Sequence, residues 1–201
     1  VWNAPLTEHQ YILSADTARG DGSDYSTFHV IDTETGEVVV EYKGRLPPDR
    51  FGDLIDQVAR EYCRALVVPE SNSYGYATIM RLRELAYPRI FTDKRQADVY
   101  LGGYTPEMDA SAYGFTTTAR SRAQVLSKLE EVLRNKEVII RSSRFYDEMK
   151  TFVWHNNKAQ AERGKHDDLI MSLAIGVWVF DTSASHSGHA AALNAAILAG
   201  M

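Results

Sequence analysis

Three short apolar runs, separated by polar turns, lie within residues 11–42, which read YILSADTARGDGSDYSTFHVIDTETGEVVVEY. Tyr11–Ala15 and Tyr25–Ile31 have the composition of strands, and the glycines and acids between them are typical of a turn. Asp32–Gly36 has the residues of a hairpin connection, and the β-rich run Glu37–Tyr42 follows it. The stretch therefore predicts three consecutive antiparallel strands.

Downstream of this stretch, helical and strand-like segments alternate. Ser121 with Gln124 resembles a capping box at a helix start, and Phe145–Trp154 mixes helix and strand signals. Phe91–Gly114 reads as a long irregular connection. We expect helices over Arg50–Cys63, Tyr76–Ala86, Ser121–Asn135 and Asp168–Phe180, and strands over Ala65–Pro69 and Val138–Ile140. This alternation predicts an α/β fold with a mixed sheet.

The composition bounds the class of protein. The chain has 201 residues, 44% of them hydrophobic and 24% charged, which suits one globular domain. We expect that domain over residues 1–181 and a flexible tail over residues 182–201, which are rich in Ser, Ala and His. The single cysteine, Cys63, can form no internal disulfide. Leu169–Phe180 is the longest apolar stretch, about a dozen residues, and is too short for a membrane helix.

The net charge and the missing motifs narrow the function. A formal charge of -5 counts mildly against a stand-alone DNA-binding protein, because such proteins are more often basic. The chain begins at Val1, so we expect a fragment whose partner domain contributes DNA affinity. The sequence has no P-loop motif for an ATPase and no C-x-x-C pair for a zinc site.

Acidic residues stand where predicted strands end and where the last predicted helix begins. Asp16 ends the first strand, Glu70 follows the strand Ala65–Pro69, and Asp167 and Asp168 open the helix. If the two strands are parallel neighbours, these carboxylates share one edge of the sheet. Mutual repulsion would then be costly without a cation among them. Mg²⁺ and Mn²⁺ prefer oxygen ligands, and two such ions about 3.5–4 Å apart can activate water for phosphodiester cleavage.

Each of these acids also has a purely structural interpretation. An Asp after a strand most often hydrogen-bonds to the backbone of the turn. For Asp16 taken alone, we give this interpretation a probability of about two in three. Glu70 could be solvated or could favour the start of the next helix. Asp167 suits an N-cap and Asp168 a first helical turn. The spacing does not decide which of these two aspartates would be the main metal ligand.

Basic residues close to the acidic positions are candidates for accessory and phosphate-binding roles. His166 could carry a proton or support a metal ligand, and Lys165 next to it could meet phosphate. For each arginine or lysine alone, a solvated surface charge is the more common outcome. The further candidates for contacts with DNA phosphates are Arg120, Arg122, Arg141, Arg144, Lys158 and Arg163.

Five motifs occur in order between residues 8 and 181. They read DTARGDGSDYS (16–26), VVPESN (67–72), GFTTTARSR (114–122), FYDEMKTFVW (145–154) and GKHDDLIMSLA (164–174). Together they resemble the C-terminal nuclease domain of tailed-phage large terminases, especially those of T-even-like myoviruses. The resemblance implies an RNase H-like fold and a metal-binding set made of Asp16, Glu70 and an aspartate of the pair Asp167 and Asp168.

The resemblance also implies a biological setting. Such a domain is a Mg²⁺- or Mn²⁺-dependent endonuclease, expected to hold two ions, that cuts concatemeric double-stranded DNA when packaging starts and when the capsid is full. An N-terminal ATPase domain of the same protein drives translocation, and the portal and small terminase subunit are the further partners. The expected location is the host cytoplasm, transiently at the procapsid portal. Two alternatives stay open: another RNase H-like nuclease such as a junction resolvase, and a non-catalytic module that docks DNA or the portal.

Overall fold

A computed structural model describes residues 1–22, 24–71, 73–92, 113–155 and 158–182. Most of the predicted irregular connection Phe91–Gly114 lies outside the described residues. The predicted flexible tail also lies outside them, apart from Thr182.

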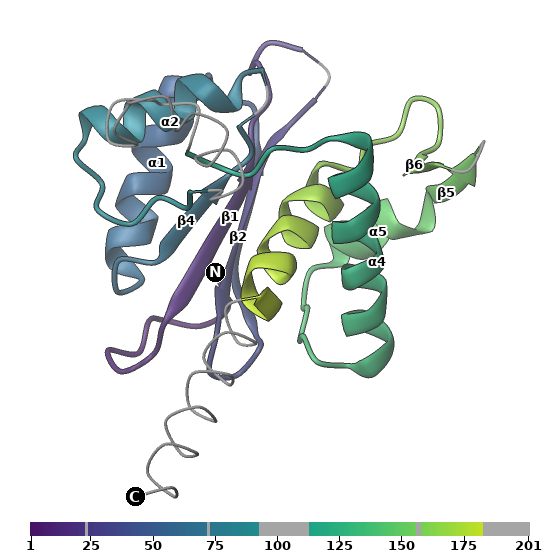
Figure 1. The fold of residues 1–201 in the computed structure, drawn as a ribbon, viewed down its shortest axis with the longest axis horizontal. Helices are drawn as coiled ribbons and strands as arrows, with labels where there is room; N and C mark the ends of the chain where they lie inside the picture. Colours follow the sequence, from purple (N-terminus) through teal and green to yellow (C-terminus); the bar gives the residue numbers. More distant parts are fainter. Residues whose placement is uncertain (23, 72, 93–112, 156–157, 183–201) are drawn as a thin grey trace, which may run out of the picture.

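A four-stranded mixed sheet forms the centre of the molecule (Figure 1). Its strands are β1 (Tyr11–Asp16), β2 (Ser26–Asp32), β3 (Val38–Gly44) and β4 (Leu66–Pro69), in the order β3-β2-β1-β4. The first three strands are antiparallel neighbours, as predicted, and β4 pairs with β1 in parallel. The parallel pairing matters for the site because it brings the C-terminal ends of β1 and β4 to the same edge of the sheet.

Two helices cover one face of this sheet. Helix α1 (Pro48–Glu61) connects β3 to β4, and α2 (Gly75–Glu84) follows β4 (Figure 1). Prolines are favoured at the start of α1, since the first turn of a helix needs no backbone donors. The buried side of α1 is apolar and carries Phe51, Ile55 and Ala59. These side chains pack in one core with side chains of the sheet, among them Leu13, Phe28 and Val30.

The other face is covered by α4 (Ala119–Asn135), α5 (Ser143–Lys150) and a helix over residues 168–182 (Figure 1). The last of these packs directly on the sheet: a Cβ atom added to Gly176 would lie 2.4 Å from Oγ of Ser14 on β1. A larger residue at position 176 would push the helix away from the strands. Because this helix also carries Asp168, its close packing fixes the position of that carboxylate.

The predicted segment 145–154 divides into most of α5 and a strand. Strand β5 (Phe152–His155) pairs with β6 (Lys158–Ala161) in a two-stranded antiparallel sheet, which we call the β5–β6 hairpin. The helix signal and the strand signal in that segment are therefore both confirmed. The predicted strand Val138–Ile140 is reduced to one bridge, between Ile139 and Glu37, because Ile139 bonds only to Gly36 and Val38.

The start of α4 differs from the prediction. Thr118, with an extended backbone, is the N-cap, and Ser121 occupies the third helical position of the capping box. The Thr118 hydroxyl accepts from the Ser121 amide at 3.1 Å, and the Ser121 hydroxyl accepts from the Thr118 amide at 2.7 Å. The predicted pairing of Ser121 with Gln124 was thus wrong by one turn. No helix in the described part of the chain is long and apolar enough to cross a membrane.

Candidate metal centre

Asp16 and Glu70 lie next to each other at one edge of the sheet. Ala15 pairs with Pro69, and the Glu70 amide donates a 2.8 Å hydrogen bond to the Ala15 carbonyl. The carboxyl groups of Asp16 and Glu70 lie within hydrogen-bonding reach of each other, and a bond between them requires a proton on one of the two. Helix α2 comes so close that a Cβ atom on Gly75 would lie 1.7 Å from the Glu70 carbonyl oxygen, so only glycine fits there. This contact fixes the backbone from which the Glu70 side chain projects.

The helix over residues 168–182 brings its first residues to the same edge. The Tyr25 amide donates to Oδ2 of Asp168 at 3.2 Å, and the Thr27 hydroxyl donates to the Asp168 carbonyl at 2.9 Å. Thr27 is the partner of Asp16 in the β1–β2 register. The start of the helix is therefore attached beside Asp16, and residues 152 positions apart in the sequence become neighbours.

The electrostatics show an excess of negative charge at this edge. The pKa of Asp16 is raised well above its ordinary value, first by burial and then by the charge and hydrogen bond of Glu70 and the charges of Asp168 and Asp167. The pKa of Asp168 is raised to about 6, mainly by burial and also by Glu148, against the opposing Tyr25 hydrogen bond. Four mutually repelling carboxylates would be relieved by a bound cation.

The residues fit a hard divalent cation by charge and by donor type. All four acids offer carboxylate oxygens, which Mg²⁺ and Mn²⁺ prefer. As they stand, however, no three acidic, histidine or cysteine side chains of the described residues are gathered closely enough to hold an ion. Two carboxylates are engaged elsewhere: Asp168 by the Tyr25 amide and Asp167 by Nη2 of Arg122 at 2.5 Å. The charge and the donor atoms therefore suit a divalent cation, while Asp167 and Asp168 accept from other groups of the chain.

Glu148 and Lys43 support the site and were not predicted from the sequence. Glu148 is buried on α5 and accepts hydrogen bonds from the amides of Leu169 and Ile170 at 2.9 and 3.3 Å. Lys43 on β3 lies 2.5 Å from its other oxygen. Glu148 thus caps the helix that carries Asp168. A sequence signal existed, because Glu148 is spaced three residues from Phe145 on the buried side of α5.

The predicted accessory residues are spread around the acidic edge. Nδ1 of His166 lies 3.6 Å from Asp168 and 3.8 Å from Asp24, and its ring packs edge-on against Tyr25. Lys165 and Arg163 are exposed in the segment before the helix. His166 is thus close enough to act on Asp168, while a role for the two exposed cations depends on a ligand.

The remaining predicted basic residues fall into two groups. Arg120 is exposed near the start of α4, and Lys158 is exposed on the β5–β6 hairpin, close to Arg122. Arg141 instead pairs with Glu37 at 3.0 Å, at the far end of the sheet, and Arg144 pairs with Glu41 at 2.7 Å. The fold does not bring Arg141 and Arg144 to the acidic edge.

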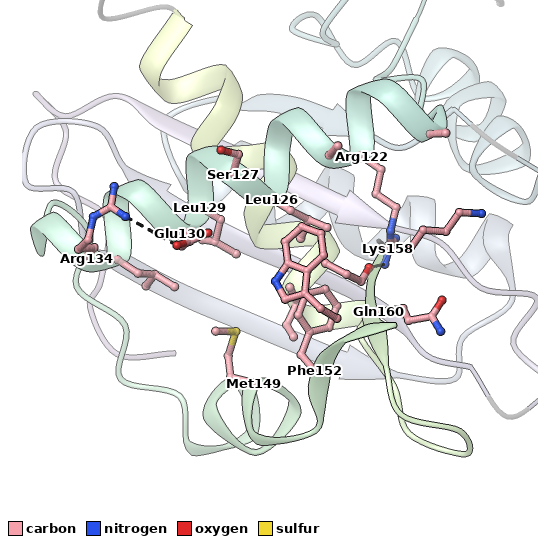
Figure 2. Close-up of a pocket in the computed structure, with 16 residues that line it drawn as sticks. Arg122, Leu126, Ser127, Leu129, Glu130, Arg134, Met149, Phe152, Lys158 and Gln160 are labelled. Carbon is pink, nitrogen blue, oxygen red and sulfur yellow. Dashed lines mark hydrogen bonds and ion pairs between the residues drawn. The ribbon is translucent and has the colours of Figure 1, made fainter. Parts of the chain in front are cut away.

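A groove of about 790 Å³ lies between α4, α5 and the β5–β6 hairpin (Figure 2). Its lining is mainly apolar, and Trp154, which is 75% exposed, is part of it. Arg122 and Lys158 lie together at one side (Figure 2). The four carboxylates do not line this groove, so it is a separate surface that meets the acidic edge only through Arg122.

Comparison with known proteins gives a consistent set of relatives. No protein-family model matches the chain. The large terminase subunits of Thermus virus P23-45 and Thermus phage G20c are each 27% identical over 180 residues, which covers 84% of this chain. The chain spans about a third, 31%, of the length of these curated relatives.

Solved structures of terminase nucleases share the fold. The large terminase nuclease of thermophilic phage G20c with bound magnesium matches with a TM-score of 0.68 at 20% identity, over 87% of this chain and 84% of that one. Its cobalt-bound form also gives 0.68, at 21% identity and the same coverage. The nuclease domain of Thermus phage P74-26 gives 0.59 at 20% identity, over 87% and 81% of the two chains.

These likenesses confirm one prediction and leave another open. The relatives are terminases of Thermus phages, so the closer likeness to T-even-like myoviruses stays a prediction. The predicted mixed sheet flanked by helices is confirmed by the topology and by the structural match. The chain is similar in sequence to phage large terminase subunits, and it has the RNase H-like fold of their nuclease domain.

Proposed function

We propose that this chain is a metal-dependent endonuclease that cuts double-stranded, concatemeric DNA during the packaging of a tailed-phage genome. One observation carries the proposal: Asp16, Glu70, Asp167 and Asp168 gather around one sheet edge, where the pKa of Asp16 is raised by burial and by the other three. Such a cluster is costly unless a cation neutralises it. The sequence relatives, which are large terminase subunits, support the choice of substrate.

Asp16 and Glu70, with Asp167 or Asp168, would hold Mg²⁺ or Mn²⁺, and we expect two ions. When bound, such ions supply Lewis-acid stabilisation of the phosphate and of the leaving oxygen in phosphodiester hydrolysis. The chain's own residues orient the ligands: Glu148 caps the helix that begins at Asp168, and the Tyr25 amide holds the Asp168 carboxylate. His166, 3.6 Å from Asp168, would serve as an accessory group.

Contacts to the DNA backbone would come from exposed cations near the acidic edge. We assign this role to Arg120, Lys158, Arg163 and Lys165, and to Arg122 once a cation is bound. Contacts to phosphate carry no sequence information, so cleavage should show little sequence preference and binding should weaken as salt is raised. Arg141 and Arg144 are less suited to this role because Glu37 and Glu41 engage them.

The rest of the packaging machinery belongs to the same proposal. Because the relatives are about three times as long as this chain, we propose an ATPase domain N-terminal to it in the full-length protein. The portal and the small terminase subunit would be its partners, and the host cytoplasm its location, transiently at the procapsid portal. The two cuts of headful packaging would be made by this one domain.

Nicking of supercoiled plasmid tests the activity. The chain is incubated with Mg²⁺ or Mn²⁺, with an EDTA control, and compared with Asp16→Asn. The matched control is Asp147→Asn, an exposed aspartate that pairs only with Lys150 among the contacts described for it. We expect metal-dependent nicking and linearisation by the parent chain and the control, and none by Asp16→Asn. Equal cutting by Asp16→Asn would remove Asp16 from the site.

The same assay separates the alternatives. Preference for a four-way junction or an RNA–DNA hybrid over linear duplex would favour another RNase H-like nuclease. Metal-loaded protein that binds duplex without nicking it, both alone and joined to its ATPase domain, would favour a non-catalytic docking module.

A further inference from the structure

The side chain of Asp167 is held by an arginine rather than by its own helix. Asp167 occupies the position before the helix over residues 168–182, where an aspartate ordinarily caps the first backbone amides. Here the backbone amides of Leu169 and Ile170 donate to Glu148 instead. Asp167 instead forms a 2.5 Å ion pair with Nη2 of Arg122, which lies 45 residues earlier, on α4.

This ion pair is well placed to act on the site. The two side chains are 30% and 25% exposed, so water screens their charges only in part. Asp167 is also close enough to Asp16 for its charge to raise the pKa of that residue. Arg122 is therefore a positive charge at the border of this group of carboxylates.

The same guanidinium contacts the β5–β6 hairpin. Nη2 of Arg122 lies 3.4 Å from the carbonyl oxygen of Ala159 on β6, a longer contact than the one to Asp167. Figure 2 shows the Arg122 side chain extending from α4 toward Lys158, with Gln160 beyond it. Arg122 thus contacts both the β5–β6 hairpin and the acidic edge.

We propose that Arg122 is a resident counter-ion that competes with a divalent cation for the Asp167 carboxylate, and that the cation displaces it when it binds. The inference rests on the proposed function, since it needs a cation site at Asp16 and Glu70. A carboxylate oxygen that accepts from a guanidinium has less electron density to offer a metal ion. A divalent cation brings twice the charge of Arg122 to the same oxygens. Displacement would turn the guanidinium toward Ala159 and Lys158, where it can meet a DNA phosphate.

Removal of Arg122 should tighten the binding of a divalent cation. Mn²⁺ binding is measured without DNA, by calorimetry and by the electron paramagnetic resonance of free Mn²⁺. We expect Arg122→Gln to bind Mn²⁺ about three- to tenfold more tightly than the parent chain, because the competing ion pair is gone. Arg122→Lys keeps the charge but loses the planar fork, so its affinity should fall between the two.

A control variant separates displacement from a general effect of charge. Arg120→Gln removes an exposed positive charge two residues away on the same helix and should change Mn²⁺ affinity less than twofold. An equal gain in Arg120→Gln and Arg122→Gln would overturn the inference. So would unchanged or weaker binding by Arg122→Gln when the parent chain binds Mn²⁺.

A second measurement uses the parent chain alone and so does not depend on the folding of a variant. The side-chain ¹⁵N resonance of Arg122 is followed while Mg²⁺ is added. We expect it to shift in step with Mg²⁺ binding, and a resonance that stays in place at saturation would overturn the inference. If neither the parent chain nor Arg122→Gln binds Mn²⁺, the proposed metal centre itself fails, which is distinct from a failure of Arg122 alone.

Discussion

Oε2 of Glu148 accepts a 2.9 Å hydrogen bond from the backbone amide of Leu169, and so a residue of α5 caps the helix that carries Asp168. The other carboxylate oxygen faces Lys43, which is 16% exposed. Replacing Glu148 by Ala leaves two helix amides and a partly buried ammonium group without this acceptor. We expect the free energy of unfolding to fall by about 2–4 kcal/mol, measured by urea denaturation.

Two further variants make this prediction specific. Glu148→Gln keeps an oxygen acceptor for the amides but loses the charge beside Lys43, so it should cost less than Glu148→Ala. Asp147→Asn changes an adjacent exposed residue, paired with Lys150, and should stay within about 0.5 kcal/mol of the parent chain. If Glu148→Ala is as stable as Asp147→Asn, the cap is not important for the helix.

Asp16→Asn should stabilise the protein when no metal is present. Burial and the charges of Glu70, Asp168 and Asp167 disfavour the ionised form of Asp16, and the amide removes that charge while keeping the shape. In EDTA we expect the free energy of unfolding to rise by about 1–2 kcal/mol. Saturating Mg²⁺ should raise the Tm of the parent chain and leave that of Asp16→Asn nearly unchanged. A loss of stability in EDTA would contradict the repulsion described above.

The pKa of Asp168, raised to about 6, sets a pH dependence of stability in EDTA. In the unfolded chain an aspartate has a pKa near 3.9, so between about pH 4 and 6 the folded state binds more protons than the unfolded state. The stability that the raised pKa of Asp168 contributes is therefore fully present below about pH 4. It is lost as the pH rises to about 6, by about 3 kcal/mol in all.

Asp168→Asn isolates this effect from other titrating groups. The amide oxygen can still accept from Tyr25, but it does not titrate. The free energy of unfolding is measured by denaturation in EDTA at several pH values. The parent chain should lose stability relative to Asp168→Asn from pH 4 to 6, and the difference should stay level above pH 6. A difference that does not change with pH would show that Asp168 titrates normally.

The strand pattern explains why half of the site could be predicted from the sequence. Asp16 and Glu70 each follow an apolar run, and the fold makes those runs the parallel neighbours β1 and β4. A local pattern is enough when the backbone pairing itself brings two residues together. The start of α4 shows the limit of this reasoning, since Thr118 and Ser121 both suit a cap and only backbone geometry decides between them.

The rest of the site depends on contacts between distant side chains. Nothing local to Glu148 indicates that it caps the helix at Leu169, and nothing local to Asp167 indicates that it turns to Arg122. The outcome for Arg144 has the same explanation. In the sequence Arg144 is one more basic residue, whereas the fold places it against Glu41 on β3. Such pairs follow from how the layers pack, which a pattern in one segment does not encode.

Arg144 and Glu41 provide the last test, because a predicted DNA contact is here part of an ion pair. Glu41 is buried and accepts from Arg144 at 2.7 Å. Burial alone would raise the pKa of Glu41, but hydrogen bonds from His29 and Ser142 and the charge of Arg144 lower it overall. A lowered pKa gives stability that is present above about pH 4.3 and is lost as the pH falls through the folded value.

Arg144→Gln should therefore lower the free energy of unfolding at pH 7 by about 1–2 kcal/mol, a value reduced by the exposure of the arginine, and should move acid unfolding to higher pH. Its affinity for duplex DNA, measured by filter binding in Ca²⁺ to prevent cleavage, should stay within about twofold of the parent chain. Lys158→Gln should behave in the opposite way: its stability should be unchanged, while DNA binding is weaker and depends less steeply on salt. If Arg144→Gln keeps its stability and loses DNA affinity, the arginine meets phosphate after all, and the DNA path must cross β3 as well as the acidic edge.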